Sequence, residues 1–198
     1  HEVEKIGIMR AYGHRHGAGP FVTEDLSLQR QFPDTNNSTN RFQVTFRVGY
    51  LDLVAIRYGI AINDGVDSLA VTCLDQLSGL PEILICMSYE YEGPFQDLDE
   101  FFEWKPIDDE RAEITAIRKP EKSLWGDERR TEILKKCRPK SRLVLNGWSH
   151  PLRGIRSISD LPRKTRMFLD FLQSRQGLDV PIKIITFGPT AADSLFFD

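Results

Sequence analysis

Apolar and polar positions along the chain follow two spacings, which predict strands and helices in turn. Short apolar runs of strand length lie at residues 5–12, 68–73, 82–89 and 180–186. Apolar side chains three and four positions apart, the spacing of one helical face, lie at residues 50–62 and 161–176. Helices that alternate with apolar strands are typical of a sheet covered on both faces. The pattern therefore predicts an α/β fold.

Polar and charged stretches interrupt this pattern. Residues 25–40 are rich in Asn, Asp, Ser and Thr, which compete with regular backbone pairing, so they predict a long surface loop. Residues 97–113 contain eight acidic and two basic residues, and residues 129–142 contain seven basic residues and one acidic residue. The basic stretch could contact phosphate or nucleic acid. Charge blocks on helices are usually solvated faces, however, and we interpret it as one.

Composition narrows the function classes. With 198 residues the chain is long enough for one domain or slightly more. Its 26 Lys and Arg against 29 Asp and Glu give a net charge of −3, which argues against a general nucleic-acid or anionic-membrane binder. The three cysteines are unclustered, as expected in a reducing cytosol, and no apolar run reaches the ~20 residues of a membrane helix. We expect a soluble protein and, because His1 opens on mid-domain sequence, a fragment.

The most specific candidate for chemistry is Asp75, which follows the predicted strand at 68–73. A carboxylate just past the carboxyl end of a strand lies where open α/β sheets bind ligands. An ionised Asp accepts two donors side by side, which suits the N1 and N2 hydrogens of guanine. The alternative is a helix N-cap, and the residues alone favour neither. Thr186, Phe187 and Gly188 follow the strand at 180–186 in the same way, with an ordinary turn as the alternative.

Other motifs that would define an enzyme are absent from the sequence. It contains no complete nucleophilic triad, no metal-ligand cluster and no phosphate-binding P-loop of the pattern GxxxxGK[ST]. His14 and His16 flank Arg15 and could bind an anion, although histidines in a loop more often only pack or face solvent. A triphosphate would therefore need a further segment to hold it.

Several segments, in order along the chain, resemble the adenylosuccinate synthetase family. They are residues 15–24, 47–58, 68–80, 147–148, 160–162 and 180–189. The resemblance covers the C-terminal part of that enzyme. It implies that residues 1–198 are the C-terminal portion of such a domain, with a variable charged insertion at about residues 94–145. The implied fold is the C-terminal part of a P-loop-like nucleotide-binding sheet with flanking helices, and the phosphate-binding half is missing.

The resemblance also implies an activity. The family is a purine-biosynthesis ligase that couples IMP to L-aspartate with GTP and Mg²⁺, through a 6-phosphoryl-IMP, to give adenylosuccinate. Its catalytic acid and base, its phosphate-binding loop and its metal ligands lie in the part that this chain lacks, so no catalytic or metal residue is assigned here and the chain alone is expected to be inactive. The intact protein is implied to be a cytoplasmic homodimer with no nucleic-acid or membrane partner.

Site residues carry over only where the motifs match. Guanine recognition is implied for Cys73, Leu74 and Asp75 and for Thr186, Phe187 and Gly188. Cys73 stands where the family usually has a lysine whose stem packs on the guanine ring, so the choice between GTP and ATP is open.

Substrate binding is implied for His16, Arg41 and Arg47, with surface charge as the alternative for both arginines. His16 is expected to lie near the IMP ribose. The aspartate loop departs from the usual Thr-Thr-Gly followed by several arginines. This departure favours, as an alternative function, a paralogue that acts on another purine nucleotide such as dGMP. A non-catalytic nucleotide-binding or interaction module is the third possibility.

Overall fold

The computed structural model describes residues 3–32, 37, 45–120 and 128–197. The chain divides into two compact units. The first unit contains residues 1–12, 63–84 and 144–198, and the second contains residues 13–62 and 85–143. Each unit is built around its own β-sheet.

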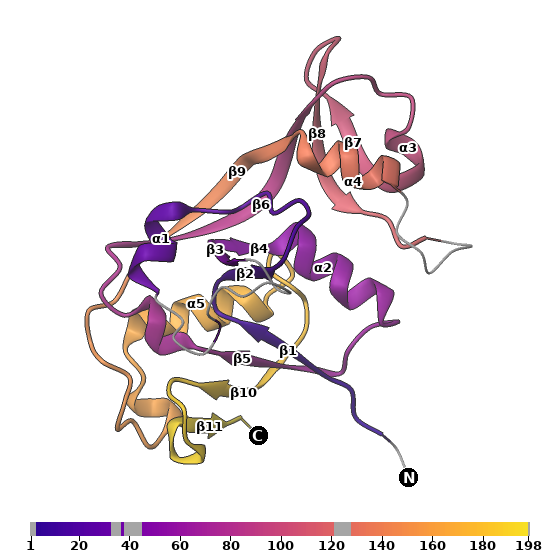
Figure 1. Cartoon of the computed structure of the whole chain (residues 1–198). Helices are drawn as coiled ribbons and strands as arrows, with labels where there is room; N and C mark the ends of the chain where they lie inside the picture. The colour runs from indigo at the N-terminus through magenta and orange to yellow at the C-terminus, as the bar shows by residue number, and fades with distance from the viewer. Residues whose placement is uncertain (1–2, 33–36, 38–44, 121–127, 198) are drawn as a thin grey trace. The chain divides into compact units, whose positions relative to one another are not determined.

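The first unit contains a four-stranded sheet in the order β1-β5-β10-β11. β1 (Ile6–Arg10), β5 (Ser68–Thr72) and β10 (Ile182–Thr186) are parallel, and β11 (Ser194–Phe196) is antiparallel to β10. Figure 1 shows β5 between its neighbours. β5 carries buried side chains on both faces, including Leu69 and Val71, because it lies in the middle of the sheet.

The helices of the first unit follow the predicted pattern. α5 (Arg163–Gln173) buries Phe168, Leu169 and Leu172, which lie three and four positions apart, and it begins directly after Pro162. Three short 3₁₀ helices complete the unit, namely η1 (Leu74–Leu77), η2 (Ile158–Asp160) and η3 (Ala191–Asp193).

The second unit contains a hairpin-like pair and a larger sheet. β2 (Gly13–His16) and β3 (Phe46–Gly49) are antiparallel. The larger sheet has the order β4-β6-β8-β7, with β9 also paired to β6. Its strands are β4 (Leu51–Asp52), most of β6 (Glu82–Glu92), β7 (Phe102–Pro106), β8 (Arg111–Ile117) and most of β9 (Cys137–Asn146). The helices are α1 (Leu26–Gln31), α2 (Leu53–Ile62), α3 (Leu98–Phe101) and α4 (Glu128–Lys135).

The α/β class predicted from the sequence is confirmed, and the structure adds that its sheets contain both parallel and antiparallel pairs. The P-loop-like relationship, the missing phosphate-binding half, the single domain at 1–198 and the insertion at about 94–145 stay predictions. Residues 94–145 contain α3, β7, β8, α4 and most of β9.

Two element predictions were wrong in part. The polar stretch at 25–40 contains α1, because the Asp25 carboxylate accepts hydrogen bonds from the backbone N–H groups of Ser27 and Leu28 and so caps a short helix. Residues 33–36 and 38–40 of this stretch lie outside the described residues.

The basic stretch at 129–142 is also only half a helix. α4 ends at Lys135, Lys136 lies in the turn that follows, and the last three bases lie on β9. There Arg138 pairs with Glu90, and Lys140 pairs with Glu113 at 2.9 Å. Two of the three bases of β9 are therefore matched by acids on neighbouring strands, whereas the Arg142 guanidinium lies over the Tyr50 ring.

Candidate functional site

The carboxyl ends of β1, β5 and β10 meet at one edge of the sheet in the first unit. Arg10 is in register with Thr72, and Val71 is in register with Ile185, so all three strands end at the same level. η1 contacts β10 directly. The segment that follows β5 therefore lies beside the segment that follows β10, at the edge where open parallel sheets bind ligands.

The segment after β5 is shaped by a left-handed residue. Cys73 has φ 60° and ψ 32°, a conformation that few residues other than glycine adopt, and it caps η1 without a side-chain hydrogen bond. Leu74 and Leu77 of η1 are buried. Asp75 lies between them in the first turn, so the structure contradicts the alternative that it serves as the N-cap.

The Asp75 side chain is half-exposed. Its carboxylate makes no hydrogen bond or ion pair with any residue that the structure describes. A carboxylate is a strong double acceptor, and one without a protein partner can accept two donors from a ligand. Asp75 therefore has the chemistry expected of a residue that binds a base edge.

The segment after β10 is held by η3. Phe187 is fully buried, and its backbone N–H donates to the Asp193 carbonyl at 2.9 Å. A Cβ at Gly188 would lie 2.6 Å from the Asp193 carboxylate, so the close approach of η3 accounts for this glycine. The hydrogen bond from Thr190 lowers the pKa of Asp193. Phe187 cannot offer its ring to a base, which leaves Thr186, Gly188 and the backbone as candidate contacts.

The residues expected to bind substrate lie in the second unit. His16 is exposed on β2, with its ring 4.8 Å from that of Phe46. Arg47 on β3 is held by a fork of two hydrogen bonds to the Glu24 carboxylate, at 3.0 and 2.8 Å. Arg41 lies outside the described residues.

Arg47 also shapes the loop that follows β2. Its Nη1 donates to the carbonyls of Gly17 and Gly19, at 3.0 and 2.9 Å. The guanidinium is thus already bound to one carboxylate and two carbonyls. Substrate binding by His16 and Arg47 stays a prediction.

A buried acid in the second unit went unrecognised in the sequence. Asp52 is 7% exposed, accepts a 2.6 Å hydrogen bond from the Tyr89 hydroxyl, and accepts the backbone N–H of Ala55 at the start of α2. Burial raises the pKa of Asp52, and the Tyr89 hydrogen bond opposes that change. The helical spacing at residues 50–62 placed Asp52 inside the predicted helix, whereas α2 begins at Leu53 and leaves Asp52 at the usual place of an N-cap Asp.

The described residues contain neither a metal-ligand cluster nor a helix suited to a membrane. Within residues 3–32, 37, 45–120 and 128–197 there is no group of three or more His, Cys, Asp or Glu side chains that could hold a metal ion. None of the helices in that part of the chain is long and apolar enough to span a membrane.

The fold and this edge define a mixed α/β protein with a parallel sheet whose carboxyl ends are the usual place for a ligand. The family model of adenylosuccinate synthetase matches residues 2–195. The chain belongs to the adenylosuccinate synthetase family.

Individual relatives agree with this membership. The adenylosuccinate synthetase of Caldicellulosiruptor bescii is 30% identical over 98% of this chain and 39% of its own length. That of Carboxydothermus hydrogenoformans is 32% identical over 100% of this chain and 39% of its own. A solved structure of fully ligated adenylosuccinate synthetase from Plasmodium falciparum shares the fold with a TM-score of 0.69 at 21% identity, over 98% of this chain and 39% of that one. The chain thus spans about two fifths of the length of these relatives.

Proposed function

We propose that this chain supplies the base-recognition edge of a purine-biosynthesis ligase that joins IMP to L-aspartate with GTP and Mg²⁺ to give adenylosuccinate. The observation that carries the proposal is the half-exposed Asp75 carboxylate, which has no partner among the described residues and lies at the carboxyl edge shared by β5 and β10. Family membership supports the proposed reaction.

Asp75 fits guanine better than adenine on chemical grounds. Guanine presents two donors side by side, N1–H and the N2 amine, and a carboxylate accepts both. Adenine presents an acceptor at N1, which would face the carboxylate unfavourably. Thr186 and Gly188, both half-exposed, are the residues after β10 that we assign to the same base. Cys73 is too short to cover the base as a lysine stem would, so the hydrogen bonds of Asp75 carry most of the selectivity.

The other groups that the proposed reaction needs are assigned to other parts of the protein. GTP binding also needs a phosphate-binding loop and Mg²⁺ ligands, and we place these, with the catalytic acid and base, in parts of the protein outside these 198 residues. We therefore propose that the chain is inactive alone and that the intact protein acts as a homodimer.

Exchange of Asp75 tests this assignment in the intact protein. Asp75→Ala should raise the KM for GTP by about 10- to 100-fold, because it leaves two base donors unpaired, and should leave the KM for IMP unchanged. Asp75→Asn should shift preference from GTP towards XTP, because the amide donates to the O2 of xanthine where guanine has an amine. Asp170→Asn, which exchanges an exposed acid of α5, is the matched control. An unchanged KM for GTP in both Asp75 variants would reject the assignment.

A second candidate function is favoured by the ion pair of Arg47. An L-aspartate carboxylate would have to compete with Glu24, which holds the guanidinium at 2.8 Å. This supports a paralogue with an altered substrate loop, acting on another purine nucleotide such as dGMP. Calorimetric titration of the intact protein with IMP, dGMP, GTP and ATP separates the two functions, since only the paralogue should bind dGMP more tightly than IMP. A protein that binds nucleotide without turnover would instead be a binding module.

A further inference from the structure

The segment that follows η1 is bonded to the segment that follows β9, and both belong to the first unit. The backbone N–H of Gly79 donates to the Trp148 carbonyl at 2.7 Å, and that of Gly147 donates to the Pro81 carbonyl at 2.9 Å. A Cβ at Gly147 would overlap the Leu80 carbonyl oxygen, so the two backbones are in direct contact. This contact joins parts of the chain that lie far apart in the sequence.

The side chain of Trp148 strengthens the same contact. It is 2% exposed, and its indole N–H donates to the Ser78 hydroxyl at 3.0 Å. The Ser78 hydroxyl donates in turn to the His150 carbonyl at 3.4 Å, so it both accepts and donates. On its other side the indole packs against the fully buried Phe168 of α5, with ring centroids 5.9 Å apart. Trp148 therefore connects the end of η1 to the buried face of α5.

η1 needs this connection because it is a single turn of four residues, and a 3₁₀ turn of this length has little stability of its own. Leu74 and Leu77 lie three positions apart, on one face of the turn, and both are buried. A turn held only along that line can rotate about it. The hydrogen bonds at Ser78 and Gly79 prevent the rotation, and the Ser78 backbone N–H also donates to the Asp75 carbonyl at 3.1 Å.

The orientation of η1 decides how many donors the Asp75 carboxylate can accept from one base. Guanine presents N1–H and the N2 amine side by side, and both hydrogen bonds weaken steeply when the carboxylate is misaligned. Hypoxanthine, the base of ITP, presents N1–H alone. A rotated carboxylate can still meet one donor but not two, so the loss of orientation affects GTP more than ITP.

We propose that Trp148 is a positioning residue for base recognition. Its hydrogen bond to Ser78 fixes η1 and thereby makes the Asp75 carboxylate selective for a base with two donors over a base with one. The inference rests on the base recognition proposed above for Asp75. Trp148 acts through Asp75 and does not itself contact the nucleotide, because its side chain is buried.

The test is calorimetric titration of the intact protein with GTP and with ITP in the presence of Mg²⁺. Wild type should bind GTP at least about tenfold more tightly than ITP, the size of one hydrogen bond to a charged group. Trp148→Phe keeps a ring against Phe168 but loses the indole N–H, and it should reduce this preference by about 3- to 10-fold and leave the Kd of IMP unchanged.

Variants of Ser78 test the same hydrogen bond from the other side. Ser78→Ala removes the acceptor at a half-exposed position and should reduce the preference as Trp148→Phe does. Ser78→Thr keeps the hydroxyl and should retain the preference. The double variant of Trp148→Phe and Ser78→Ala should be no worse than either single variant, because both remove one shared interaction.

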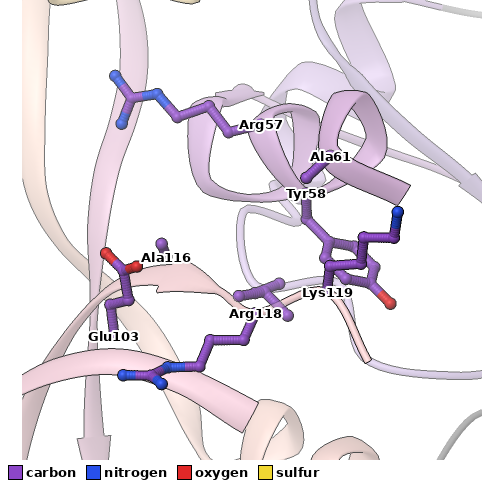
Figure 2. A pocket seen from close by; sticks show the side chains of 8 residues that line it. Arg57, Tyr58, Ala61, Glu103, Ala116, Arg118 and Lys119 are labelled. Carbon is purple, nitrogen blue, oxygen red and sulfur yellow. The ribbon is translucent and has the colours of Figure 1, made fainter. Parts of the chain in front are cut away.

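Trp104→Phe is the matched control. Trp104 follows Glu103, which lines a pocket of about 450 Å³ in the second unit (Figure 2), and its indole N–H donates to Asp99 at 2.8 Å. The variant therefore also removes an indole N–H that donates to a side chain, but far from η1 in the sequence and in the other unit. It should leave the preference for GTP over ITP at the wild-type value.

Three results would overturn the proposal. The first is a wild-type preference for GTP over ITP in both Trp148→Phe and Ser78→Ala. The second is equal weakening of GTP and ITP by Trp148→Phe, which would mean a purely structural role. The third is the same loss in Ser78→Thr as in Ser78→Ala, which would mean packing and not a hydrogen bond.

Asp75→Ala separates this inference from the proposed function. If Asp75→Ala binds GTP as wild type does, the base recognition itself is rejected. If Asp75→Ala weakens GTP binding and the Trp148 and Ser78 variants keep the preference, only the positioning role is rejected.

Discussion

Replacement of Tyr89 by phenylalanine removes one hydroxyl group from the interior of the second unit. The Tyr89 side chain is 1% exposed, and its hydroxyl donates to Oδ2 of Asp52 at 2.6 Å. Oδ1 of Asp52 still accepts the hydrogen bond from the backbone N–H of Ala55 in the variant. The variant keeps the aromatic ring and its packing, so the perturbation is the loss of one hydrogen bond to a buried carboxylate.

The expected loss of stability follows from the burial of both Tyr89 and Asp52. A buried charged acceptor left without its donor costs about 2 to 3 kcal/mol of unfolding free energy. For a chain of this size, each kcal/mol corresponds to a melting shift of about 2 to 4 °C, so the expected fall in Tm is about 4 to 12 °C.

The stability lost in Tyr89→Phe should also depend on pH. Burial raises the pKa of Asp52, so the folded state binds this proton more tightly than the unfolded chain does. Stability from this group is present at low pH and falls as pH rises from the ordinary value, 3.8, through the folded pKa. The Tyr89 hydroxyl favours the charged form, so its removal raises the pKa further. The difference between wild type and variant should therefore be larger at pH 8 than at pH 5.

Urea unfolding followed by circular dichroism at these two pH values measures the effect. Tyr91→Phe is the matched control, because the Tyr91 hydroxyl donates to a neutral carbonyl, that of Pro94, at 3.2 Å. Its loss should be smaller, about 1 kcal/mol, and equal at both pH values. A Tyr89→Phe loss below about 0.5 kcal/mol at pH 8, or one that does not change with pH, would refute the role assigned to the buried pair.

Three further predictions concern stability. Hydrogen bonds from Lys140, and then from a serine and a second lysine, lower the pKa of Glu113 to about 2. Glu113→Gln should therefore lower the unfolding free energy by about 1 to 3 kcal/mol at pH 7 and by almost nothing near pH 2, since this contribution is lost as pH falls from 4.5 through 2. Parallel acid-unfolding curves for wild type and variant would contradict this prediction. Gly147→Ala should lower stability by about 2 kcal/mol or more in a thermal melt, because its Cβ would lie 1.8 Å from the Leu80 carbonyl oxygen, and an unchanged Tm would be inconsistent with this packing. Arg47→Lys keeps the positive charge but loses the pair of hydrogen bonds to the Glu24 carboxylate, so Tm should fall by about 2 to 4 °C. An unchanged Tm would favour a substrate-binding role for Arg47 over a structural one.

The elements that were predictable from the sequence are those whose burial leaves a local trace. β5 and β10 are short apolar runs because they are covered on both sides, and α5 carries its buried side chains at helical spacing. α2 begins three residues later than the periodicity predicts, because Leu51 and Asp52 pair with Ile85 and Cys86 of β6. That pairing joins distant segments, and local spacing contains no sign of it.

The charged stretches at residues 97–113 and 129–142 show the same limit of prediction from local sequence. Its acids and bases were visible as blocks, but their pairing depends on the register between β6, β8 and β9. Glu113 meets Ser88 and two lysines from different strands only once the sheet forms.

The sequence by itself determined the chemistry available at the candidate base site. It placed a carboxylate after one apolar strand and a glycine loop after another, and its ordered motifs indicated the family. Only the tertiary structure decided that the two segments adjoin, through the parallel register of Val71 with Ile185, and that Asp75 has no partner among the described residues. The physical reason is that residue type and local spacing are encoded in neighbouring positions, whereas adjacency of strands and the satisfaction of a side chain arise from contacts between segments far apart in the chain.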